Sequence, residues 1–139
     1  MIKKLIVTTL VGTFVYFVFG WFVFEFFLGN YTSLNTTQLE GFKKSPEQSS
    51  LLFLIVSCAA YALLMSYILV NHLNIKSLVK AFFIGSTVGV LVAIMADTYW
   101  YATTNFYSNF MVVLLDIIGA AVSVGTMSLV IAFVNKKLS

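Results

Sequence analysis

The chain has 139 residues, of which 60% are hydrophobic and 17% aromatic, while only 9% carry a charge. Soluble domains carry about 25% charged residues, so this composition excludes soluble enzymes, secreted disulfide scaffolds and disordered chains together. The formal net charge of +3 comes from eight lysines without any arginine, which removes the bidentate guanidinium of phosphate recognition and gives no sign of nucleic-acid binding. We therefore expect one integral membrane domain, residues 1–139, in contact with the lipid bilayer.

Four apolar segments are long enough to cross a bilayer as helices, which takes about 20 residues each. We place these spans at about 5–28, 47–71, 79–102 and 109–135, with a loop over 29–46. The first span follows two lysines, but it is long and aromatic and lacks a small-residue cleavage site, so we interpret it as an uncleaved helix rather than a signal peptide. The predicted fold is an all-α, four-helix membrane bundle.

The start of the second span is marked by a short capping pattern. Ser45 fits the position before the helix, Pro46 its first position, and Gln48 the residue that closes a capping box. The sequence therefore predicts that the second helix begins near Pro46.

The placement of the lysines predicts the orientation. Six of them lie at the two termini and in the loop between the second and third spans, which share one side of the membrane: Lys3, Lys4, Lys76, Lys80, Lys136 and Lys137. The other two, Lys43 and Lys44, lie between the first and second spans, where Glu40 and Glu47 balance them. We expect both termini in the cytoplasm and the first loop outside, and this bias argues against a dual-topology exporter.

Aromatic residues crowd the first span, where they occupy nine of the fourteen positions from Phe14 to Phe27. Side chains at this density must point to every side of a helix with 3.6 residues per turn. We favour an aromatic belt in contact with lipid. A docking surface for a partner helix is the alternative.

Small residues predict where helices meet, because helices in lipid associate through close backbone contact. The third span carries Gly85, Gly89 and Ala93 at intervals of four residues. The fourth span contains another group of small residues, namely Gly119, Ala120, Ser123, Gly125 and Ser128. We expect the third and fourth spans to form the close-packed centre of the bundle.

Three carboxyl groups lie within or at the end of a span, where each costs about 2.5–3.5 kcal/mol. Asp97 continues the small-residue stripe of the third span, and Asp116 precedes that of the fourth. Each lies about 14 Å along its helix from a turn centred near Phe106, so we expect the two to be level and to face the interior. Glu25 either reaches the same pocket or extends to water, and we favour water.

Because no lysine lies at their depth, adjoining Asp97 and Asp116 carboxyls would share one proton. The expected hydrogen-bond partners are hydroxyl and amide groups of the third span, namely Thr98, Tyr99, Tyr101, Thr103, Thr104 and Asn105. One alternative is purely structural, with these bonds fixing helix register. The other is a site for a proton, a cation or a polar ligand, unless Lys43 or Lys44 folds over and neutralises the acids.

Metal binding and catalysis receive little support. The single histidine, His72, lies near the cytoplasmic end of the second span, far from the acids, which lie towards the outer side. No Ser–His or Cys–His pair is in reach. We therefore expect no metal, no cofactor and no enzymatic activity.

Two stretches resemble a known group of proteins, namely GTFVYFVFGW from Gly12 to Trp21 and DTYWYATTN from Asp97 to Asn105, followed by Asp116. In these the chain resembles small four-span bacterial inner-membrane proteins known only as a domain of unknown function. The resemblance extends over nearly the whole chain and implies a bacterial inner-membrane location. It points to Asp97, Asn105 and Asp116 and implies no activity.

The sequence favours a non-enzymatic membrane module that works as a homo-oligomer or as an accessory subunit of a larger complex. The small-residue stripes, the aromatic first span and the small mass outside the membrane are the reasons. The alternative is a small transporter, or a proton- or cation-coupled carrier, that uses Asp97 and Asp116.

Overall fold

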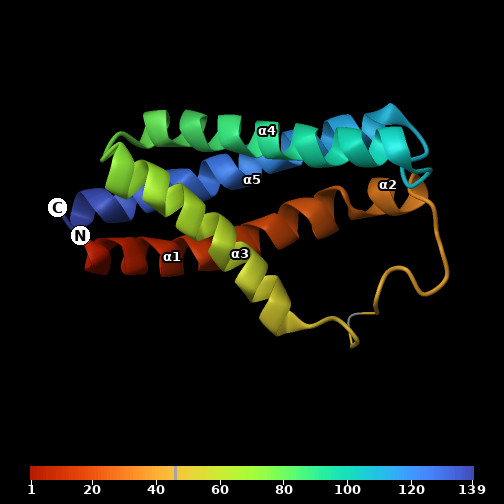
Figure 1. Ribbon diagram of the computed structural model, residues 1–139, viewed down its shortest axis with the longest axis horizontal. Helices are drawn as coiled ribbons and strands as arrows, with labels where there is room; N and C mark the ends of the chain where they lie inside the picture. Colours follow the sequence, from red (N-terminus) through yellow and green to blue (C-terminus); the bar gives the residue numbers. More distant parts are fainter. Residues whose placement is uncertain (46) are drawn as a thin grey trace.

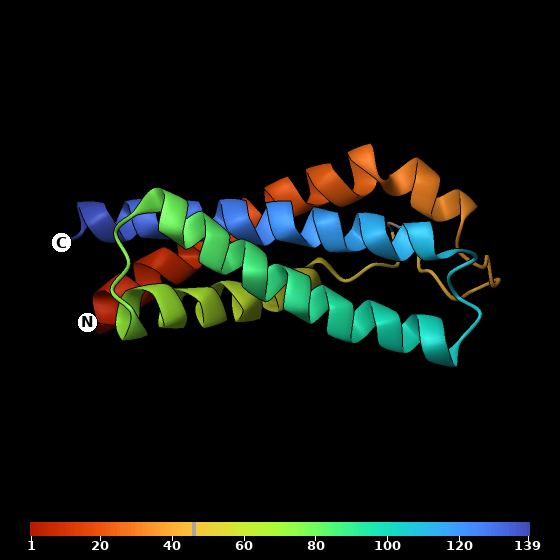
Figure 2. The ribbon, with the colours of Figure 1, turned by 90° about the horizontal axis from the view of Figure 1, so that it is seen from above.

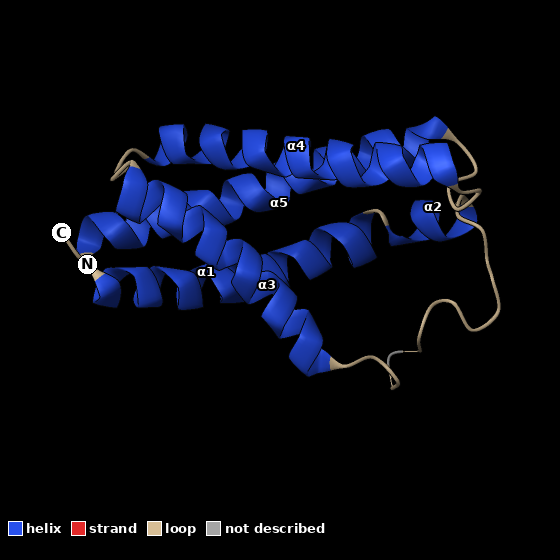
Figure 3. Cartoon of the chain, in the orientation of Figure 1, coloured by secondary structure: helices blue, strands red, loops and turns tan. Residues whose placement is uncertain are grey.

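Four long helices make up most of the chain in a computed structural model that describes residues 1–45 and 47–139. Each is long and apolar enough to cross a membrane: Ile2–Phe27, Leu51–His72, Leu78–Thr103 and Phe110–Lys137. No strand occurs in the described part of the chain (Figure 3). The all-α four-helix bundle predicted from the sequence is therefore confirmed, and the protein is a multi-pass membrane protein by the length and composition of its helices.

Two of the four crossings end in wider helical turns. The elements in chain order are α1 (Ile2–Trp21), η1 (Phe22–Phe27), α2 (Gly29–Leu34), α3 (Leu51–Ser66), η2 (Tyr67–His72), α4 (Leu78–Thr103) and α5 (Phe110–Lys137). Here η denotes π-helical turns, which are wider than those of an α-helix and continue α1 and α3 without a break. Side chains cap the N-termini of the last two helices. Ser77 Oγ accepts from the N–H of Lys80 (3.4 Å), and Asn109 Oδ1 accepts from the N–H of Val112 (3.3 Å).

The second crossing begins later than predicted. Pro46, where we expected the helix to start, lies outside the described residues. The N–H groups of Gln48 and Ser49 both donate to the carbonyl of Ser45 (3.0 Å), and the Ser49 hydroxyl donates to the same oxygen. This local turn ends at Ser50, whose backbone is extended, and α3 starts at Leu51. Serine side chains that bond to nearby backbone groups compete with a helix in this way.

The two chain termini lie at the same end of the bundle (Figure 1). We name this end the termini end, and the opposite end, which holds residues 104–109 between α4 and α5, the turn end. The ammonium of Lys4 donates to the hydroxyl of Ser139 (3.1 Å), which joins the first helix to the end of the last. The helix ends that carry the six lysines named above therefore share the termini end.

Helix α5 is the common partner of the other helices, with α4 lying antiparallel along it (Figures 1 and 2). The buried residues of α4 recur every four positions: Ala81, Gly85, Gly89, Ala93 and Asp97. A Cβ atom at Gly89 would lie 2.7 Å from the carbonyl oxygen of Ala120, and one at Gly85 would lie 2.7 Å from that of Val124. The two backbones therefore approach each other closely because the small residues leave no side chain between them.

The small residues of α5 serve more than one neighbour. Ser123 and Gly125 are buried, and the hydroxyl of Ser86 on α4 donates to the carbonyl of Ala121 (2.9 Å). Gly119 faces the first crossing instead, since a Cβ atom there would lie 2.8 Å from the ring of Phe24. Helix α5 thus presents small residues to α4 on one side and to η1 on another.

Helix α3 is packed along only part of its length. Towards the termini end its side chains join α1 and α5 in a fully buried apolar core that contains Ala62, Met65, Leu69, Met127 and Ile131. Towards the turn end the helix stands away from the bundle (Figure 1), and its first six residues are 41–72% exposed. The bundle has four helices near the termini and three packed helices near the turn end.

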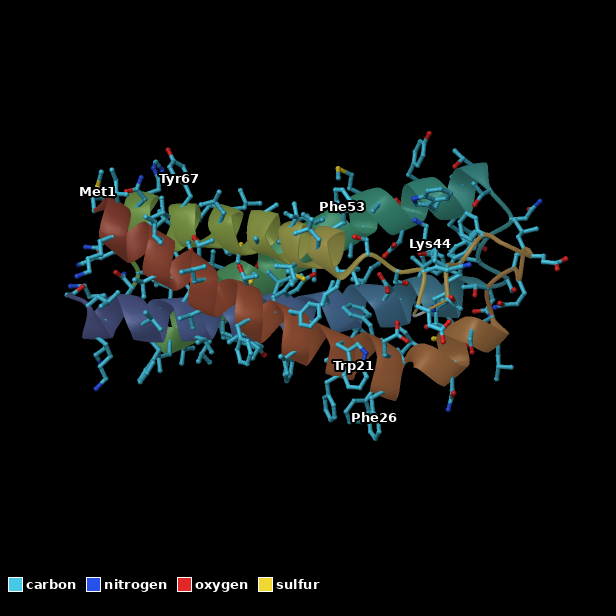
Figure 4. All side chains as sticks on the ribbon, turned by 90° about the horizontal axis from the view of Figure 1, so that it is seen from below. Met1, Trp21, Phe26, Lys44, Phe53 and Tyr67 are labelled. Atoms are coloured by element: carbon cyan, nitrogen blue, oxygen red, sulfur yellow. The ribbon has the colours of Figure 1, made fainter. Side chains whose placement is uncertain are left out.

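The aromatic residues of the first crossing divide between the interior and the outside. The ring of Tyr16 packs edge-on against Tyr61 of α3 with centroids 5.3 Å apart, and Phe24 packs over Gly119. Trp21 and Phe26 point away from the bundle (Figure 4) and are 61% and 67% exposed. One part of the aromatic run therefore builds the interior, and the rest forms an exposed apolar face.

Candidate functional site

Asp97 and Asp116 occupy matching positions in the α4–α5 hairpin. Asp97 lies six residues before the end of α4 at Thr103, and Asp116 lies six residues after the start of α5 at Phe110. At about 1.5 Å per residue, each is about 9 Å from the turn end of its helix. The predicted depth of about 14 Å was counted from Phe106, which lies in the turn of residues 104–109, whereas this depth is counted from the ends of the two helices.

The carboxyl groups of Asp97 and Asp116 lie close enough for their charges to interact, and for a hydrogen bond between them when one is protonated. Asp97 is only 7% exposed and belongs to the buried stripe that faces α5, whereas Asp116 is half-buried. Oδ1 of Asp97 accepts a hydrogen bond from the hydroxyl of Tyr107 (3.1 Å). Oδ2 is buried and meets no N–H or O–H donor among the described residues. A single proton held between the two carboxyls would satisfy it.

Tyr107 is the residue that the sequence analysis missed. Burial, and then the charge of the adjacent Asp97 and the hydrogen bond to it, raise the pKa of Tyr107 well above its ordinary value. Its hydroxyl therefore stays protonated and available as a donor at physiological pH. The sequence contained a signal for it, because Tyr107 sits in the turn almost midway between two acids at equal depth, and a long side chain there can fold back between the helices.

A set of hydrogen bonds between two loops holds Tyr107 in place, and we name residues 35–37 and 105–109 the clasp. The N–H of Thr37 donates to the carbonyl of Phe106 (2.7 Å), and the N–H of Ser108 donates to the carbonyl of Asn35 (2.8 Å). The side-chain amide of Asn109 also donates to Oδ1 of Asn35 (2.8 Å). Since Asn109 is the residue that caps α5, the clasp ties the first loop to the start of the helix that carries Asp116.

The hydroxyl and amide groups that we expected around the acids are used elsewhere. The hydroxyls of Thr98, Thr103 and Thr104 donate to carbonyls of their own helix, four residues back. Tyr101 is exposed, with its ring edge-on to Phe110, and the main-chain oxygen of Asn105 accepts from the hydroxyl of Thr37. The threonine part of the expected shell is therefore wrong. A threonine in a helix satisfies its hydroxyl on the nearest free carbonyl lone pair before it reaches a neighbouring helix.

A cavity of about 740 Å³ opens beside Asp116, and we name it the turn-end cavity. Its walls come from η1 and α2, from the loop over residues 36–44, and from α5 with the adjoining turn. Glu25 lines it and is also exposed, so this side chain reaches both the cavity and the surface. Lys43 and Lys44 line the same space, which shows that the first loop folds over the acidic region.

The loop is held over the cavity by an aromatic contact and a tight turn. The ring of Phe42 packs against that of Phe106 with centroids 5.6 Å apart, and its N–H donates to the carbonyl of Leu39 (3.1 Å). Between them Gly41 has φ +77°, a left-handed conformation that side chains disfavour. This turn returns the chain so that Phe42, Lys43 and Lys44 all line the cavity.

No group of three or more His, Cys, Asp or Glu side chains in residues 1–45 and 47–139 is arranged to hold a metal ion. Comparisons of the chain with protein-family models, curated proteins and solved structures found no match. The resemblance to four-span bacterial proteins of unknown function stays a prediction. Asp97, Asp116, Tyr107 and the cavity beside them are the features from which a function can be inferred.

Proposed function

We propose that this protein is a small membrane carrier that binds a proton or a small cation at Asp97 and Asp116. The main supporting observation is a nearly fully buried carboxyl that interacts electrostatically with a second carboxyl at the wall of a cavity. Two ionised carboxylates that lie close together in a low-dielectric interior repel each other strongly. A bound proton or cation removes this repulsion, so the pair has a chemical reason to take one up.

The two carboxyls have different places in this proposal. Asp116 lines the turn-end cavity and is therefore the group that meets an incoming proton or cation. Asp97 lies behind it, where Tyr107 donates to one carboxylate oxygen and leaves the other for the shared proton or cation. Tyr107 acts as a positioning residue, because its hydroxyl donates to Oδ1 of Asp97 and so fixes that carboxyl.

The proposed orientation has the termini end in the cytoplasm and the turn-end cavity outside, in a bacterial inner membrane. The support is the placement of six lysines at the termini end, since cytoplasmic segments carry the excess of lysine. In this orientation the cavity would take its proton or cation from the outer side. No catalytic step is part of the proposal, which describes binding and exchange of a charge.

Proton binding is tested by labelling with dicyclohexylcarbodiimide, which reacts with protonated carboxyl groups in apolar sites. We expect one adduct on the intact protein, falling as the pH rises and absent from the double variant Asp97→Asn/Asp116→Asn. The matched control is Glu40→Gln, which removes an exposed loop carboxyl outside the cavity lining. Labelling that persists in the double variant, or that does not depend on pH, would contradict the shared proton.

Transport is tested in liposomes that contain a pH-sensitive dye. We expect an imposed pH or cation gradient to drive flux through the wild-type protein and through Glu40→Gln, and not through Asp97→Asn or Asp116→Asn. All four proteins should insert equally, as judged by flotation with the liposomes. Undiminished flux in both aspartate variants would rule out the carrier.

A second candidate is an oligomeric module or an accessory subunit of a membrane complex. The observation that favours it is the start of α3, where six successive apolar residues stand away from the other helices with 41–72% of their surface exposed. Native mass spectrometry of the protein, extracted from its own membrane in mild detergent, tests this. Foreign subunits or a fixed number of copies would support the module, and a single chain would argue against it.

A further inference from the structure

The turn-end cavity has an unusual combination of charges, because acids and lysines face the same space from different walls. Glu25 projects from η1 and Asp116 from α5, whereas Lys43 and Lys44 belong to the loop that folds over the opening. Figure 4, seen from below, shows Lys44 on this loop, which crosses in front of the turn-end halves of the helices in that view. The negative groups therefore come from the helical walls and the positive groups from the loop.

We propose that the turn-end cavity binds a zwitterionic amphiphile, with its ammonium group directed to Glu25 and Asp116 and its anionic group to Lys43 and Lys44. This ligand site deepens the proposed function, since Asp116 belongs to both, but Glu25 and the two lysines belong to the cavity alone. The ligand would occupy the space between the helices and the loop. Its ammonium group would be the cation nearest to the carboxyl pair.

The charge balance of the cavity favours a zwitterion over a simple ion. Two acidic and two basic residues line the space, so an inorganic anion would leave the acids unmatched and an inorganic cation would leave the lysines unmatched. Asp116 is half-buried and the other three side chains are exposed, so the charges act chiefly through specificity, because a ligand that brings like charges together is disfavoured. A molecule that carries both charges matches both walls at once.

The remaining walls and the size favour an amphiphile over a small polar molecule. Four large apolar side chains line the cavity, namely Phe24, Leu39, Phe42 and Phe106. The volume of about 740 Å³ lies within the range of about 300–1,000 Å³ that is usual for small-molecule sites. Such a space is larger than an amino acid without a side chain needs, and its rings would contact an apolar portion of the ligand.

Two sources could supply this chemistry, namely a water-soluble zwitterion such as a short apolar peptide and the headgroup of an aminophospholipid. Both carry a primary ammonium group, an anionic group and an apolar portion. The cavity lies at the turn end of the bundle, where a loop and the ends of membrane-crossing helices meet, so each source has access to it. The experiment therefore has one arm for each source.

The soluble arm uses the dipeptide phenylalanyl-leucine and two matched analogues with the purified full-length protein in detergent. The N-acetyl dipeptide lacks the ammonium group and the dipeptide amide lacks the carboxylate, while the apolar portion is unchanged. We expect the dipeptide to bind at least about tenfold more tightly than either analogue in calorimetry, the loss typical of an unpaired charge in a partly buried site.

The lipid arm uses nanodiscs that contain equal parts of phosphatidylethanolamine, phosphatidylglycerol and phosphatidylcholine. We expect native mass spectrometry to show selective retention of phosphatidylethanolamine if the source is a lipid headgroup. Selectivity in either arm supports the zwitterion site and identifies its source. If the dipeptide binds no better than its analogues and phosphatidylethanolamine is not enriched, the proposal is wrong.

Variants link the selectivity to the named side chains. Lys43→Gln/Lys44→Gln should lower the preference for the dipeptide over the dipeptide amide by about tenfold. Glu25→Gln should lower the preference for the dipeptide over the N-acetyl dipeptide by about tenfold. The matched controls are Lys136→Gln/Lys137→Gln at the termini end and Glu40→Gln in the loop. Equal selectivity in the cavity variants and the controls would overturn the assignment.

The two proposals fail separately. Carbodiimide labelling reports the proton at Asp97 and Asp116 and does not require Glu25, Lys43 or Lys44. Selectivity for the zwitterion depends on Glu25, Lys43 and Lys44. Normal labelling without zwitterion selectivity would remove the ligand site and leave the carrier, while selectivity without pH-dependent labelling would remove the carrier and leave a binding protein.

Discussion

Helices α4 and α3 both pack on α5, and they do so over very different lengths. Helix α4 stays in contact from Gly85, whose Cβ position lies against Val124, to Asp97, which meets Asp116 near the turn end. Helix α3 contributes Met65 to a buried core, to which its continuation η2 adds Leu69, but its first six residues lie away from the bundle and are exposed. The same partner helix is therefore covered fully on one side and only partly on the other.

The difference shows what holds helices together when lipid surrounds them. Lipid tails are as apolar as leucine side chains, so burial alone does not drive two helices together, and close fit has to do it. Helix α4 has a small residue or Asp97 at every fourth position of its buried face. The exposed start of α3 reads Leu-Leu-Phe-Leu-Ile-Val and offers no such face. Part of the space that α3 leaves near the turn end is covered by a loop, under which the turn-end cavity lies.

The largest effect is expected where the close fit of α4 on α5 is broken. In Gly89→Ala the new methyl would lie 2.7 Å from the backbone oxygen of Ala120 and 3.0 Å from Val124. Backbone atoms of a helix cannot move aside locally, so the helices must separate. We expect a loss of about 3 kcal/mol in the free energy of unfolding, measured by titration with a denaturing detergent in mixed micelles.

Gly20→Ala is the matched control for this substitution. Gly20 is also a helical glycine, but a Cβ atom there would have no other atom within 4 Å. We expect its free energy of unfolding to be unchanged or slightly increased, because alanine favours a helix over glycine. An equal loss in both variants would show that glycine itself, and not the close approach of α4 to α5, determines stability.

A smaller effect is expected from α3, and its size should depend on the half of the helix. Met65→Ala removes a fully buried side chain and leaves a cavity, which should cost about 2 kcal/mol. Phe53→Ala removes a larger side chain that is 72% exposed, and should cost less than about 0.5 kcal/mol. Both are measured in the same mixed micelles. A comparable loss for Phe53→Ala would mean that another chain covers the start of α3 and would strengthen the oligomeric module.

The packing of α4 on α5 was predictable from the sequence, because spacing by four residues is a local property that needs no knowledge of other helices. That four helices are long and apolar enough to cross a membrane was predictable too, because length and hydropathy are local properties of a segment. The divergence of α3 was not, since a uniformly apolar helix gives no indication of which side is covered. Gly119 shows the same limit: its size predicted a close contact, but only the fold shows that the contact is with Phe24 rather than with α4.

The candidate site was predictable in its acids and not in their partners. Asp97 lay on a small-residue stripe and Asp116 at the same distance from the turn, so their meeting followed from the geometry of a helical hairpin. The threonines near Asp97 looked like partners because they are close in sequence, but their hydroxyls bond to their own helix. The placement of Tyr107 depends on the clasp, which joins residues about 70 positions apart, and no local pattern encodes such a contact.

The third prediction concerns the contact that the clasp positions. Tyr107→Phe leaves Oδ1 of Asp97 without its donor, which should cost about 1.5 kcal/mol in the free energy of unfolding at neutral pH. The raised pKa of Tyr107 in the folded protein means that the wild-type advantage is fully present below about pH 10, the ordinary value for tyrosine, and is lost as the pH rises above it. The measurement is the unfolding of both proteins between neutral and strongly alkaline pH. An advantage that is constant over this whole interval would mean that Tyr107 ionises equally in the folded and unfolded states, and hence that its hydroxyl is neither buried nor bound to Asp97. A loss of about 1.5 kcal/mol at neutral pH together with an advantage that shrinks only in the alkaline range is the result expected for the buried, hydrogen-bonded hydroxyl.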